Sequence, residues 1–554
     1  MAGKQIAHTS SAYGYPLLIR SLLRTGLAAA PEQQIVYSDR KEMTYREFGE
    51  RVGRLASALA GLGVAVGDTV GVMDWDSHRY LECFFAIPMM GAVLHTINVR
   101  LSPEQILHTI NHAEDDLMLI NAEFLPVLEA IWDRVDPGKK LVLLCDTASE
   151  PATSLRLAGE YEALLSHADP DYHFPELDEN AQATTFYTTG TTGLPKGVYF
   201  SHRQLVLHTL GMRTALAGSG QGRINGDDVY MPVTPMFHVH AWGMPYVATT
   251  LGLKQVYPRR YVPDHLCYLL TRERVTFSHC VPTILQMILA TASKKGVDLT
   301  NWKVIIGGAA LPRALALQAL EMGIDVFAGY GMSETGPILT LAQLEPHMRS
   351  WDLDRQAEVR CRTGRVVSMV EIRIVDEAMN DLPHDGQSSG EIVARAPWLT
   401  QGYYRDGANS EKLWAGGWLH TGDIGVMDRD GWLRITDRLK DVIKTGGEWV
   451  SSLDVEDLLL RHSAVEEAAV IGVPDPKWSE RPMAVVVLKP HAKATQADLK
   501  EHMREYAGRG LISNYAVPEH VIFASEIPKT SVGKIDKKRL REKYNAPATE
   551  AKDA

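Results

Sequence analysis

The chain has 554 residues, about three to four times the length of a single domain, so at least two domains are expected. Apolar residues make up 45% of it and charged residues 23%, as in ordinary globular enzymes and unlike disordered or fibrous chains. With 57 basic and 68 acidic side chains the net charge is −11, which argues against nucleic acid as a main partner.

The cysteines and the apolar stretches indicate the cellular compartment in which the protein is expected. The five cysteines are odd in number and never form a C-x-x-C pair, which argues against a disulfide framework and favours a reducing compartment. The N-terminus lacks the continuous apolar region of a signal peptide. Residues 229–253 contain no charged side chain, but three prolines and two histidines interrupt them. We therefore expect a buried strand-and-loop segment there, no membrane span and a cytoplasmic location.

The first roughly 180 residues alternate helical and strand-like runs. Apolar positions three and four apart predict an amphipathic helix over Arg46–Leu62, and a short β-branched run predicts a strand over Asp68–Met73. The same helix-to-strand order recurs at Pro103–Ala113 with Leu117–Ile120, and at Tyr268–Glu273 with Val275–His279. Such alternation is typical of parallel sheets covered by helices, an α/β architecture.

Residues 187–198 read YTTGTTGLPKGV, with four threonines, three glycines and one lysine. Glycines let backbone N–H groups approach an anion, hydroxyls donate hydrogen bonds, and Lys196 supplies positive charge, so we expect a phosphate-binding loop. It is not a Walker A loop, because Pro195 and Gly197 stand where that motif needs other residues. A helix is predicted over Ser201–Met212, with its N-terminus close behind the loop.

The best domain boundary lies near Asp437. Residues 416–432 before it are typical of short strands and turns, and a helix is expected to begin near Ser451, with Asp454 as the partner in its cap. The last hundred or so residues predict a small α+β domain, with strands at Glu467–Val473, Ala484–Leu488 and His520–Phe523 and helices at Gln496–Tyr506 and Lys537–Lys543. We therefore expect one domain over residues 1–436 and a second over residues 437–554.

The threonine-rich loop resembles the phosphate-binding signature of the adenylate-forming (AMP-binding) superfamily, which includes acyl-CoA synthetases, luciferases and peptide-synthetase adenylation domains. Four further motifs follow in the superfamily's order: GYGMSET (329–335) for adenine, LHTGD (419–423) for ribose, DRLKD (437–441) for the hinge and PKTSVGK (528–534) for the adenylation lysine. The resemblance implies an α/β fold with a large N-terminal domain of helix-covered sheets and a small mobile α+β C-terminal domain.

The resemblance also implies a site, residue by residue. Catalysis is expected from Lys534, Glu334 and Thr188, and metal binding from Thr188 and Glu334. ATP or AMP is expected to contact Thr188, Thr189, Gly190, Thr191, Thr192, Lys196, Val239, Gly308, Gly329, Tyr330, Gly331, Ser333, Glu334, Asp423, Arg438, Lys440, Lys444 and Trp449. The acyl pocket is expected from His238, Trp242, Gly307, Gly308, Ala309 and Tyr330, and the hinge and CoA side from Asp437, Gly446, Gly447 and Glu448.

Elementary chemistry supports three of these roles. Glu334 beside a polyphosphate would be repulsive unless a cation such as Mg²⁺ lies between them. Asp423 can accept hydrogen bonds from both ribose hydroxyls. Lys534 can stabilise the charge that builds when a carboxylate attacks the α-phosphate of ATP.

Residues 236–246 (MFHVHAWGMPY) resemble the acyl-pocket segment of fatty acyl-CoA synthetases, where a tryptophan, here Trp242, gates the acyl tunnel. Amino-acid-activating relatives carry an aspartate where His238 stands, so an α-amine would lack its counter-charge and amino acids are disfavoured. Small residues at Gly307–Ala310 leave room for a long or bulky acyl chain. His238 and His240 lack a third ligand at suitable spacing, so we interpret them as pocket or core histidines rather than a metal site.

The resemblance favours an acyl-CoA synthetase that uses ATP, Mg²⁺ and coenzyme A to activate a carboxylic acid, preferably a medium- or long-chain fatty acid. It also suggests a homodimer. Several alternatives stay open: a CoA ligase for an aryl, cyclic or sulfur-containing acid, an adenylating enzyme with a non-CoA acceptor, a luciferase-like oxidation of the adenylate, and a nucleotide-binding or carrier-loading module without catalysis.

Overall fold

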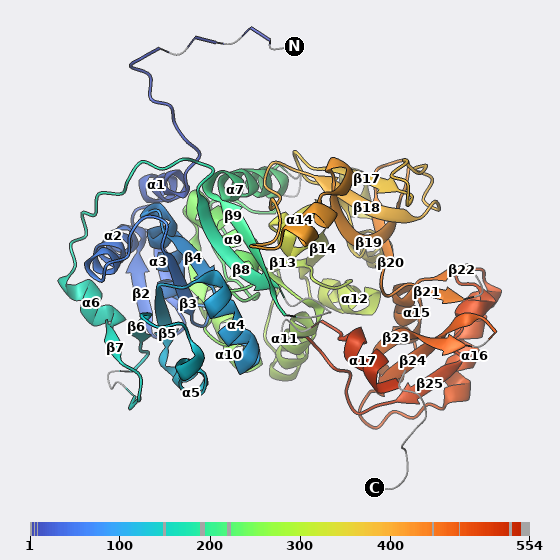
Figure 1. The fold of residues 1–554 in the computed structure, drawn as a ribbon. Coiled ribbons are helices and arrows are strands. Elements are labelled where there is room, and N and C mark those ends of the chain that lie inside the picture. Colours follow the sequence, from blue (N-terminus) through green and yellow to red (C-terminus); the bar gives the residue numbers. More distant parts are fainter. Residues whose placement is uncertain are drawn as a thin grey trace.

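The computed structural model describes residues 3–4, 6–7, 9–147, 151–188, 194–218, 223–445, 448–475, 477–530 and 534–544. Figure 1 shows a large, sheet-rich N-terminal part and a smaller C-terminal part. The fold is α/β, as the sequence predicts, with four sheets.

The first sheet of the large part has seven strands in the order β7-β6-β5-β3-β4-β8-β9, parallel except for the antiparallel β8–β9 pair. Its strands are β3 (Thr69–Met73), β4 (Val93–Thr96), β5 (Leu117–Asn121), β6 (Lys140–Leu144), β7 (Leu157–Glu160), β8 (Gln182–Thr188) and β9 (Lys196–Ser201). The central strand β5, LMLIN, is buried along its whole length, as expected for a parallel strand covered on both faces.

The second sheet has nine strands in the order β16-β15-β14-β13-β12-β10-β11-β1-β2, and the stretch from β14 to β1 is parallel. Its strands are β1 (Gln34–Tyr37), β2 (Lys41–Thr44), β10 (Val229–Tyr230), β11 (Lys254–Tyr257), β12 (Phe277–Cys280), β13 (Lys303–Ile306), β14 (Asp325–Gly331), β15 (Ile338–Leu341) and β16 (Arg365–Val366).

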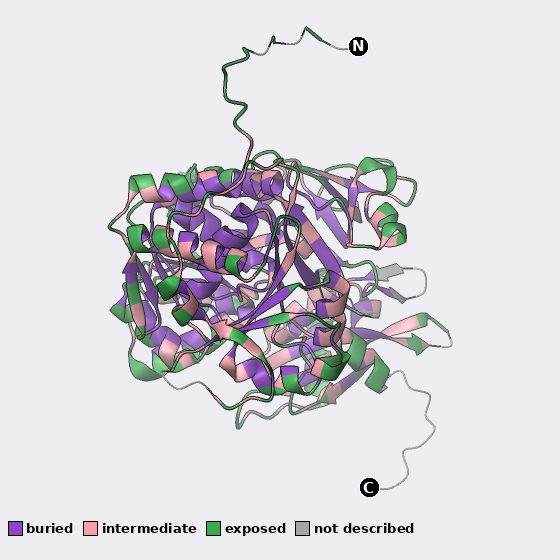
Figure 2. Cartoon of the chain, turned by 60° about the vertical axis from the view of Figure 1, so that its left-hand side comes forward, coloured by how far each residue is buried: buried purple, intermediate pink, exposed green. Residues whose placement is uncertain are grey.

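Helix α3 (His78–Met89) fills the core between these two sheets. Every residue of it is buried, and it contacts β4 and β8 of the first sheet and β1 of the second. A helix with no exposed face is enclosed on all sides, and Figure 2 shows such buried residues running through the sheets and the inner helices.

The remaining helices and short 3₁₀ turns of the large part cover the sheets. They are α1 (Ile19–Ala29), α2 (Tyr45–Gly61), α4 (Pro103–Ala113), η1 (Ala122–Phe124), α5 (Leu125–Glu129), η2 (Trp132–Arg134), α6 (Tyr161–His167), α7 (His202–Ala217), α8 (Val239–Trp242), α9 (Met244–Leu251), α10 (Pro263–Arg272), α11 (Pro282–Lys295), α12 (Arg313–Glu321), η3 (Ser333–Thr335), η4 (Pro346–Ser350), α13 (Leu353–Arg360), α14 (Gly407–Leu413) and η5 (Ala415–Gly417).

A four-stranded antiparallel sheet leads toward the C-terminal part, in the order β17 (Glu371–Val375), β18 (Gly390–Arg395), β19 (Leu419–Met427) and β20 (Leu433–Arg438). The C-terminal sheet follows, with β21 (Ile443–Thr445), β22 (Glu448–Val450), β23 (Val465–Asp475), β24 (Ser479–Leu488) and β25 (His520–Phe523). Its helices are α15 (Ser452–Leu460), α16 (Gln496–Gly508), η6 (Asn514–Ala516) and α17 (Lys537–Tyr544).

Most of the predicted elements are confirmed. The expected helix over Arg46–Leu62 is α2, which begins with a capping box at Thr44, and α4 and β5 match their predicted ranges within one residue. In the C-terminal part, the Ser451 hydroxyl accepts a hydrogen bond from the backbone N–H of Asp454 and so caps α15. The predicted strands near 467 and 484 are halves of one long hairpin, β23 and β24.

Three expectations were wrong. Residues 229–253 are buried but include the helix α9, which starts after Gly243 in left-handed conformation and has Pro245 in its first turn. Residues 416–432 hold the nine-residue strand β19 in place of short strands and turns alone. The helix after the phosphate-binding loop does not begin beside it: β9 intervenes, and Ser201, which caps α7, pairs with Gln182 at the opposite end of the β8–β9 hairpin.

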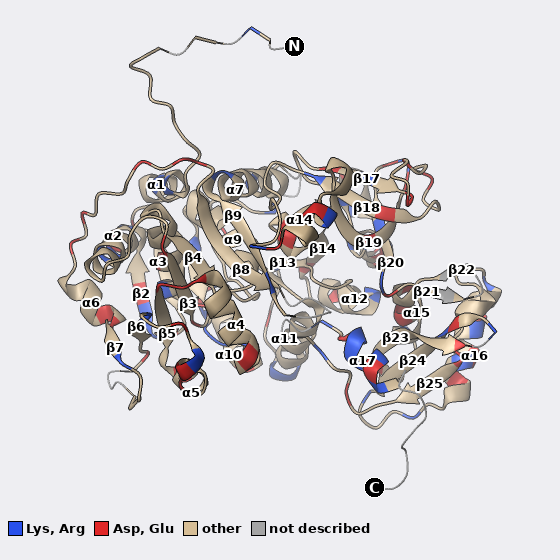
Figure 3. Cartoon of the chain, in the orientation of Figure 1, with Lys and Arg blue, Asp and Glu red and all other residues tan. Residues whose placement is uncertain are grey.

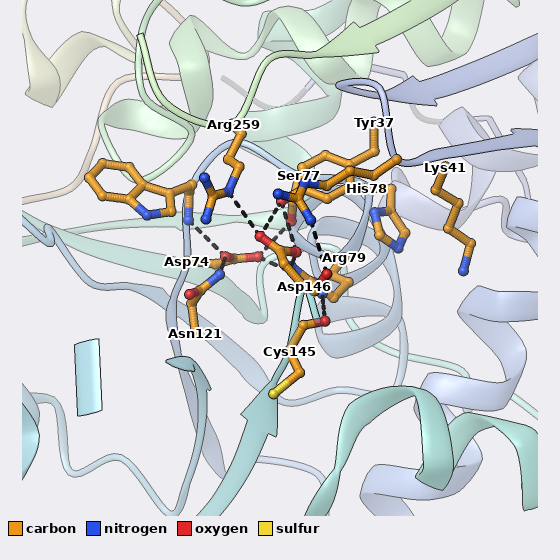
Figure 4. Close-up of polar contacts among 12 residues, drawn as sticks. Tyr37, Lys41, Asp74, Ser77, His78, Arg79, Asn121, Cys145, Asp146 and Arg259 are labelled. Carbon is orange, nitrogen blue, oxygen red and sulfur yellow. Dashed lines mark hydrogen bonds and ion pairs between the residues drawn. The ribbon is translucent and has the colours of Figure 1, made fainter. Parts of the chain in front are cut away.

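A buried polar network joins the two large sheets at the carboxyl ends of their strands (Figure 4). Asp146 follows β6, and its carboxylate pairs with Arg79 at 2.6 Å and with Arg259 at 2.9 Å. Tyr37, at the end of β1, donates a hydrogen bond to the same carboxylate at 3.0 Å. Because these groups are paired inside the protein, the charges are tolerated and link the sheets.

Within the described part of the chain, no helix combines the length and apolarity needed to cross a bilayer. The five cysteines all belong to that part and form no disulfide bonds.

We predict that Asp146→Ala lowers the free energy of unfolding by about 1.5–3 kcal/mol, because it removes a charge-assisted hydrogen bond and leaves the buried Arg79 only its longer pair with Asp74 at 3.6 Å. Glu104→Gln, in an exposed pair with Arg134, should cost less than about 1 kcal/mol. Urea denaturation followed by fluorescence measures both changes, and similar small losses in the two variants would contradict the role of the network.

The effect of Asp146→Ala on the free energy of unfolding should depend on pH. Although burial acts in the opposite direction, Arg79 and the hydrogen bonds lower the pKa of Asp146 below its usual value. The stabilisation by the ionised carboxylate is therefore present above the ordinary carboxyl range and is lost as the pH falls through the lowered pKa. The difference in unfolding free energy between wild type and Asp146→Ala should shrink in that acid range.

Candidate active site

A cavity of about 40 Å³ lies at the carboxyl ends of β4, β10, β12 and β13, where the C-terminal part reaches the large part. The carboxyl ends of parallel strands are the usual place for a ligand in open α/β sheets. Its wall is formed by Arg100, Val233, Thr234, Pro235, His238, Trp242, Tyr261, Val281, Thr283, Ile284, Gly308 and Lys534. Lys534 is the one member of this wall that comes from the C-terminal part.

The ammonium group of Lys534 reaches the cavity beside Gly308. A Cβ atom at position 308 would lie 3.3 Å from Cε of Lys534, and Gly308 has a φ of +80°, so glycine suits both the backbone and the close approach. Burial, followed by the nearby Arg438, lowers the pKa of Lys534 to about 8, whereas Asp423 and Glu334 act in the opposite direction. The lysine is therefore a cation that an anionic ligand would stabilise.

Glu334 lies in η3, directly after β14, and is buried. Its carboxylate accepts a hydrogen bond of 2.8 Å from the Tyr403 hydroxyl. Burial raises the pKa of Glu334, and the Tyr403 bond opposes that shift. Lys196, the first residue of β9, places its ammonium 4.6 Å from the centre of the Tyr403 ring, and it pairs with Thr188 across the hairpin.

Asp423 in β19 is buried and faces residues from two other motifs. One carboxylate oxygen accepts a 2.9 Å hydrogen bond from the Tyr330 hydroxyl, and the other lies 3.3 Å from Nε of Arg438. The adenine, ribose and hinge motifs of the sequence therefore meet at one carboxylate. A carboxylate in this position suits a diol such as ribose.

Trp242 closes one side of the cavity from a strained turn. Each residue from Val239 to Trp242 has a positive φ, between 41° and 59°, although none is glycine. Such a left-handed turn costs about 1–2 kcal/mol per residue. The indole ring packs 4.9 Å from the ring of His279, and a Cβ at Gly307 would approach it to 2.9 Å, so the space left by the small residue is filled by the tryptophan.

The histidines of the pocket segment are neutral. Burial, helped by Lys534 and Arg100, lowers the pKa of His238 to about 3. His240 points away from the cavity and is surrounded by the rings of Phe84, Phe186 and Phe200. Within the described ranges, no group of three or more His, Cys, Asp or Glu side chains is arranged to hold a metal ion.

The hinge motif is anchored by backbone hydrogen bonds. One carboxylate oxygen of Asp437 accepts from the N–H of Ser452 at 2.6 Å, and the other from the N–H of Arg438 at 2.7 Å. The basic helix α17, blue in Figure 3, follows Lys534 in the chain and returns to this region through an ion pair between Arg541 and Asp441. The position of Lys534 is thus coupled to the hinge.

The structure brings some of the predicted residues together: His238, Trp242, Gly308 and Lys534 line the cavity, and Tyr330, Asp423 and Arg438 contact one another. Gly329, Tyr330 and Gly331 lie in β14, Ser333 lies in η3, and Lys440 follows β20. Ala309 and Tyr330 do not line the cavity. Thr189, Gly190, Thr191, Thr192, Gly446 and Gly447 lie outside the described residues, as do the side chains of Lys444, Glu448 and Trp449.

Sequence reasoning missed several members of the cavity wall and one residue behind it. Arg100 and Tyr261 line the cavity, and buried Asp76 holds two parts of its wall by accepting hydrogen bonds from the Tyr261 hydroxyl and the backbone N–H of Met236. It also missed Tyr403. The segments are far apart in sequence, and no spacing rule signals their contact.

The geometry agrees with comparisons to known proteins. Residues 23–404 match the family model described as AMP-binding enzyme, and residues 454–534 match the AMP-binding enzyme C-terminal domain. The chain is 42% identical over 504 residues to a long-chain-fatty-acid–CoA ligase of Thermus thermophilus, covering 90% of each chain. It is 37% identical over 539 residues to a 3-methylmercaptopropionyl-CoA ligase of Ruegeria pomeroyi, covering 96% of this chain and 97% of the relative.

Solved structures share the fold. The anthranilate CoA ligase AuaEII, solved with anthranoyl-AMP, superposes with a TM-score of 0.84 at 24% identity, over 96% of this chain and 98% of that one. ATP-bound MatB from Rhodopseudomonas palustris gives a TM-score of 0.82 at 25% identity, over 96% and 99%. By its family matches and its relatives, the chain belongs to the AMP-binding enzyme family.

Proposed function

We propose that the protein is an AMP-forming acyl-CoA synthetase, an acid–thiol ligase that uses ATP, Mg²⁺ and coenzyme A. The observation that carries the proposal is that Lys534 lines the cavity while its ammonium lies close enough to the carboxylates of Asp423 and Glu334 for both to act on its pKa, since these groups come from three separate motifs. The family match and the CoA ligases among the relatives support it. The predicted domain limits, 1–436 and 437–554, and the residue roles are part of this proposal. Homodimerisation and a cytoplasmic location stay predictions.

In the first half-reaction, a carboxylate oxygen of the acid attacks the α-phosphorus of ATP. A P–O bond to the acid forms, the bond from the α-phosphorus to the bridging oxygen breaks, and pyrophosphate leaves with the electron pair. Lys534 stabilises the charge that develops on the oxygens around the α-phosphorus. Asp423 orients the ribose, and Lys196 faces the phosphates.

The residues present fit a magnesium ion. Glu334 offers a buried carboxylate, and Thr188, at the end of β8, offers a hydroxyl, both hard oxygen ligands of the kind that Mg²⁺ prefers. When bound, Mg²⁺ neutralises charge on the phosphate oxygens.

In the second half-reaction, the CoA thiol attacks the acyl carbon. A C–S bond forms, the C–O bond to AMP breaks, and the thiol proton leaves to solvent. We propose that the C-terminal part rotates about Asp437 between the two half-reactions and withdraws Lys534 from the cavity. The short segment between β20 and β21 is the place where a few residues can absorb such a change.

For the acid, we propose a medium- or long-chain fatty acid. Neutral His238 and the mainly apolar wall provide no counter-charge for an amino group, which disfavours amino acids. The cavity of about 40 Å³ is far smaller than a usual ligand pocket of roughly 300–1,000 Å³, so an acyl chain requires that Trp242 move. The relative named for 3-methylmercaptopropionate favours a sulfur-containing acid as the second candidate.

The substrate experiment measures ATP-dependent release of AMP and pyrophosphate with a panel of acids, each with and without CoA. The panel contains short, medium and long fatty acids, 3-methylmercaptopropionate, benzoate, a cyclohexane acid and amino acids. We expect acyl-CoA from the fatty acids and no turnover of amino acids. Formation of adenylates that CoA never accepts would overturn the synthetase assignment, and light emission in the presence of oxygen would favour a luciferase-like reaction.

We predict that Lys534→Ala lowers the rate of adenylation by about 10²–10³-fold, the usual effect of losing one group that stabilises the transition state. Thioester formation from supplied acyl-AMP and CoA should stay within about threefold of wild type, since Lys534 has then left the site. Lys538→Ala, four residues along and largely exposed, is the matched control and should leave both half-reactions unchanged. If Lys534→Ala lowers the rates of adenylation and of thioester formation equally, the assignment of Lys534 to adenylation alone is refuted.

Lys534 stabilises anions only while its side-chain amine is protonated, so the rate of adenylation should fall at alkaline pH. We expect kcat/KM for pyrophosphate formation to fall as the pH rises through about 8, the lowered pKa of this lysine. Lys534→Arg, which stays charged throughout, should remove that fall even if its rate is lower. An unchanged alkaline limb in the arginine variant assigns the titration to another group.

A further inference from the structure

Tyr403 lies between two parts of the site, contacting Glu334 on one side and Lys196 on the other. Its hydroxyl donates to Oε1 of Glu334 at 2.8 Å, and its ring lies 4.6 Å below the ammonium of Lys196. Glu334 follows β14 of the nine-stranded sheet, whereas Lys196 begins β9 of the seven-stranded sheet. One side chain therefore bridges the proposed metal ligand and the lysine of the phosphate-binding loop.

The segment that carries Tyr403, residues 400–404, is fixed to both neighbours through its backbone. The N–H of Thr400 donates to the carbonyl of Glu334 at 3.0 Å, and the N–H of Tyr404 donates to the carbonyl of Gly197 at 2.8 Å. The Thr400 hydroxyl adds a 2.9 Å bond to the carbonyl of Tyr199 in β9. These bonds set the distance between β9 and η3 at the level of the tyrosine ring.

Helix α14 supports the segment from the other side. The N–H of Tyr403 donates to the Ser410 hydroxyl at 2.9 Å, and Nε1 of Trp414 donates to the carbonyl of Thr400 at 3.0 Å. With its backbone held from two sides and its side chain half-buried, Tyr403 is pre-organised and does not need to be ordered when a ligand binds.

Each contact fixes the place of one charge. The Tyr403 hydroxyl donates to one oxygen of the buried Glu334 carboxylate, which holds that group in one orientation. The aromatic face attracts the Lys196 ammonium, which fixes where that charge lies.

We propose that Tyr403 is a positioning residue that holds Glu334 oriented for the magnesium ion of Mg·ATP and at the same time aligns Lys196 with the phosphates. This inference rests on the proposed function, because it assigns Glu334 to the metal and Lys196 to ATP. Tyr403 acts through these two residues and not on the reacting atoms. Its two contacts separate into two measurable effects, one carried by the hydroxyl and one by the ring.

The experiment compares Tyr403→Phe and Tyr403→Leu in the full-length enzyme. Two quantities are measured: the Mg²⁺ concentration for half-maximal adenylation, and the affinity for ATP in EDTA and in excess Mg²⁺. Tyr403→Phe removes only the hydroxyl, so we expect an approximately tenfold higher Mg²⁺ requirement and unchanged ATP affinity in EDTA. Tyr403→Leu also removes the ring, so its ATP affinity in EDTA should fall about three- to tenfold.

A second variant separates positioning from a general structural effect. Introducing Tyr403→Phe into Glu334→Gln should add nothing to the Mg²⁺ requirement, because the charge that it serves is absent.

Tyr404→Phe is the matched control. Its ring packs on His112 and Arg405, outside the site, and the substitution should leave both quantities within about twofold of wild type. A wild-type Mg²⁺ requirement in Tyr403→Phe overturns the inference alone. A wild-type enzyme whose ATP turnover needs no Mg²⁺ overturns the proposed function instead, so the two failures are distinguishable. If Tyr403→Leu does not fold, the Mg²⁺ requirements of Tyr403→Phe and of its double mutant with Glu334→Gln still test the inference.

Discussion

The proposed site depends on one buried cation. The C-terminal part brings Lys534 into a cavity of the large part, where burial and Arg438 lower its pKa and Asp423 and Glu334 oppose that shift only in part. An ammonium in such a place is stable only with anions nearby. The hinge, the glycine at position 308 and the carboxylates all serve to place that charge, and an anionic ligand would complete the arrangement.

Around this cation, each sheet contributes one function. The nine-stranded sheet ends in the adenine motif and Glu334, the seven-stranded sheet supplies Thr188 and Lys196, and β19 of the antiparallel sheet supplies Asp423. The polar network around Asp146 ties the two large sheets at the same strand ends, and the segment with Tyr403 ties them beside the site. Trp242 closes one side of the cavity from a strained, left-handed turn.

Local signals explain what was predictable from the sequence. Capping residues and periodicity placed α2, α4, α15 and β5, and the motifs named Lys534, Glu334 and Asp423. Tertiary contacts explain the misses: α9 forms in a segment where prolines disfavour a long helix but Pro245 suits a first turn, and the strand pairing of β9 moves the start of α7 away from the phosphate-binding loop. Tyr403, Arg100 and Asp76 join the site through contacts between distant segments, which no local pattern reports.

The most direct test of the buried-cation account is a crystal structure with a non-hydrolysable acyl-adenylate analogue. The account predicts that Nζ of Lys534 lies within hydrogen-bond distance of the oxygens that replace the acyl carbonyl and the α-phosphate, with the ribose hydroxyls on Asp423 and Trp242 displaced by the acyl chain. An analogue bound with Lys534 in the cavity but out of reach, or with the ribose on residues other than Asp423, would contradict it.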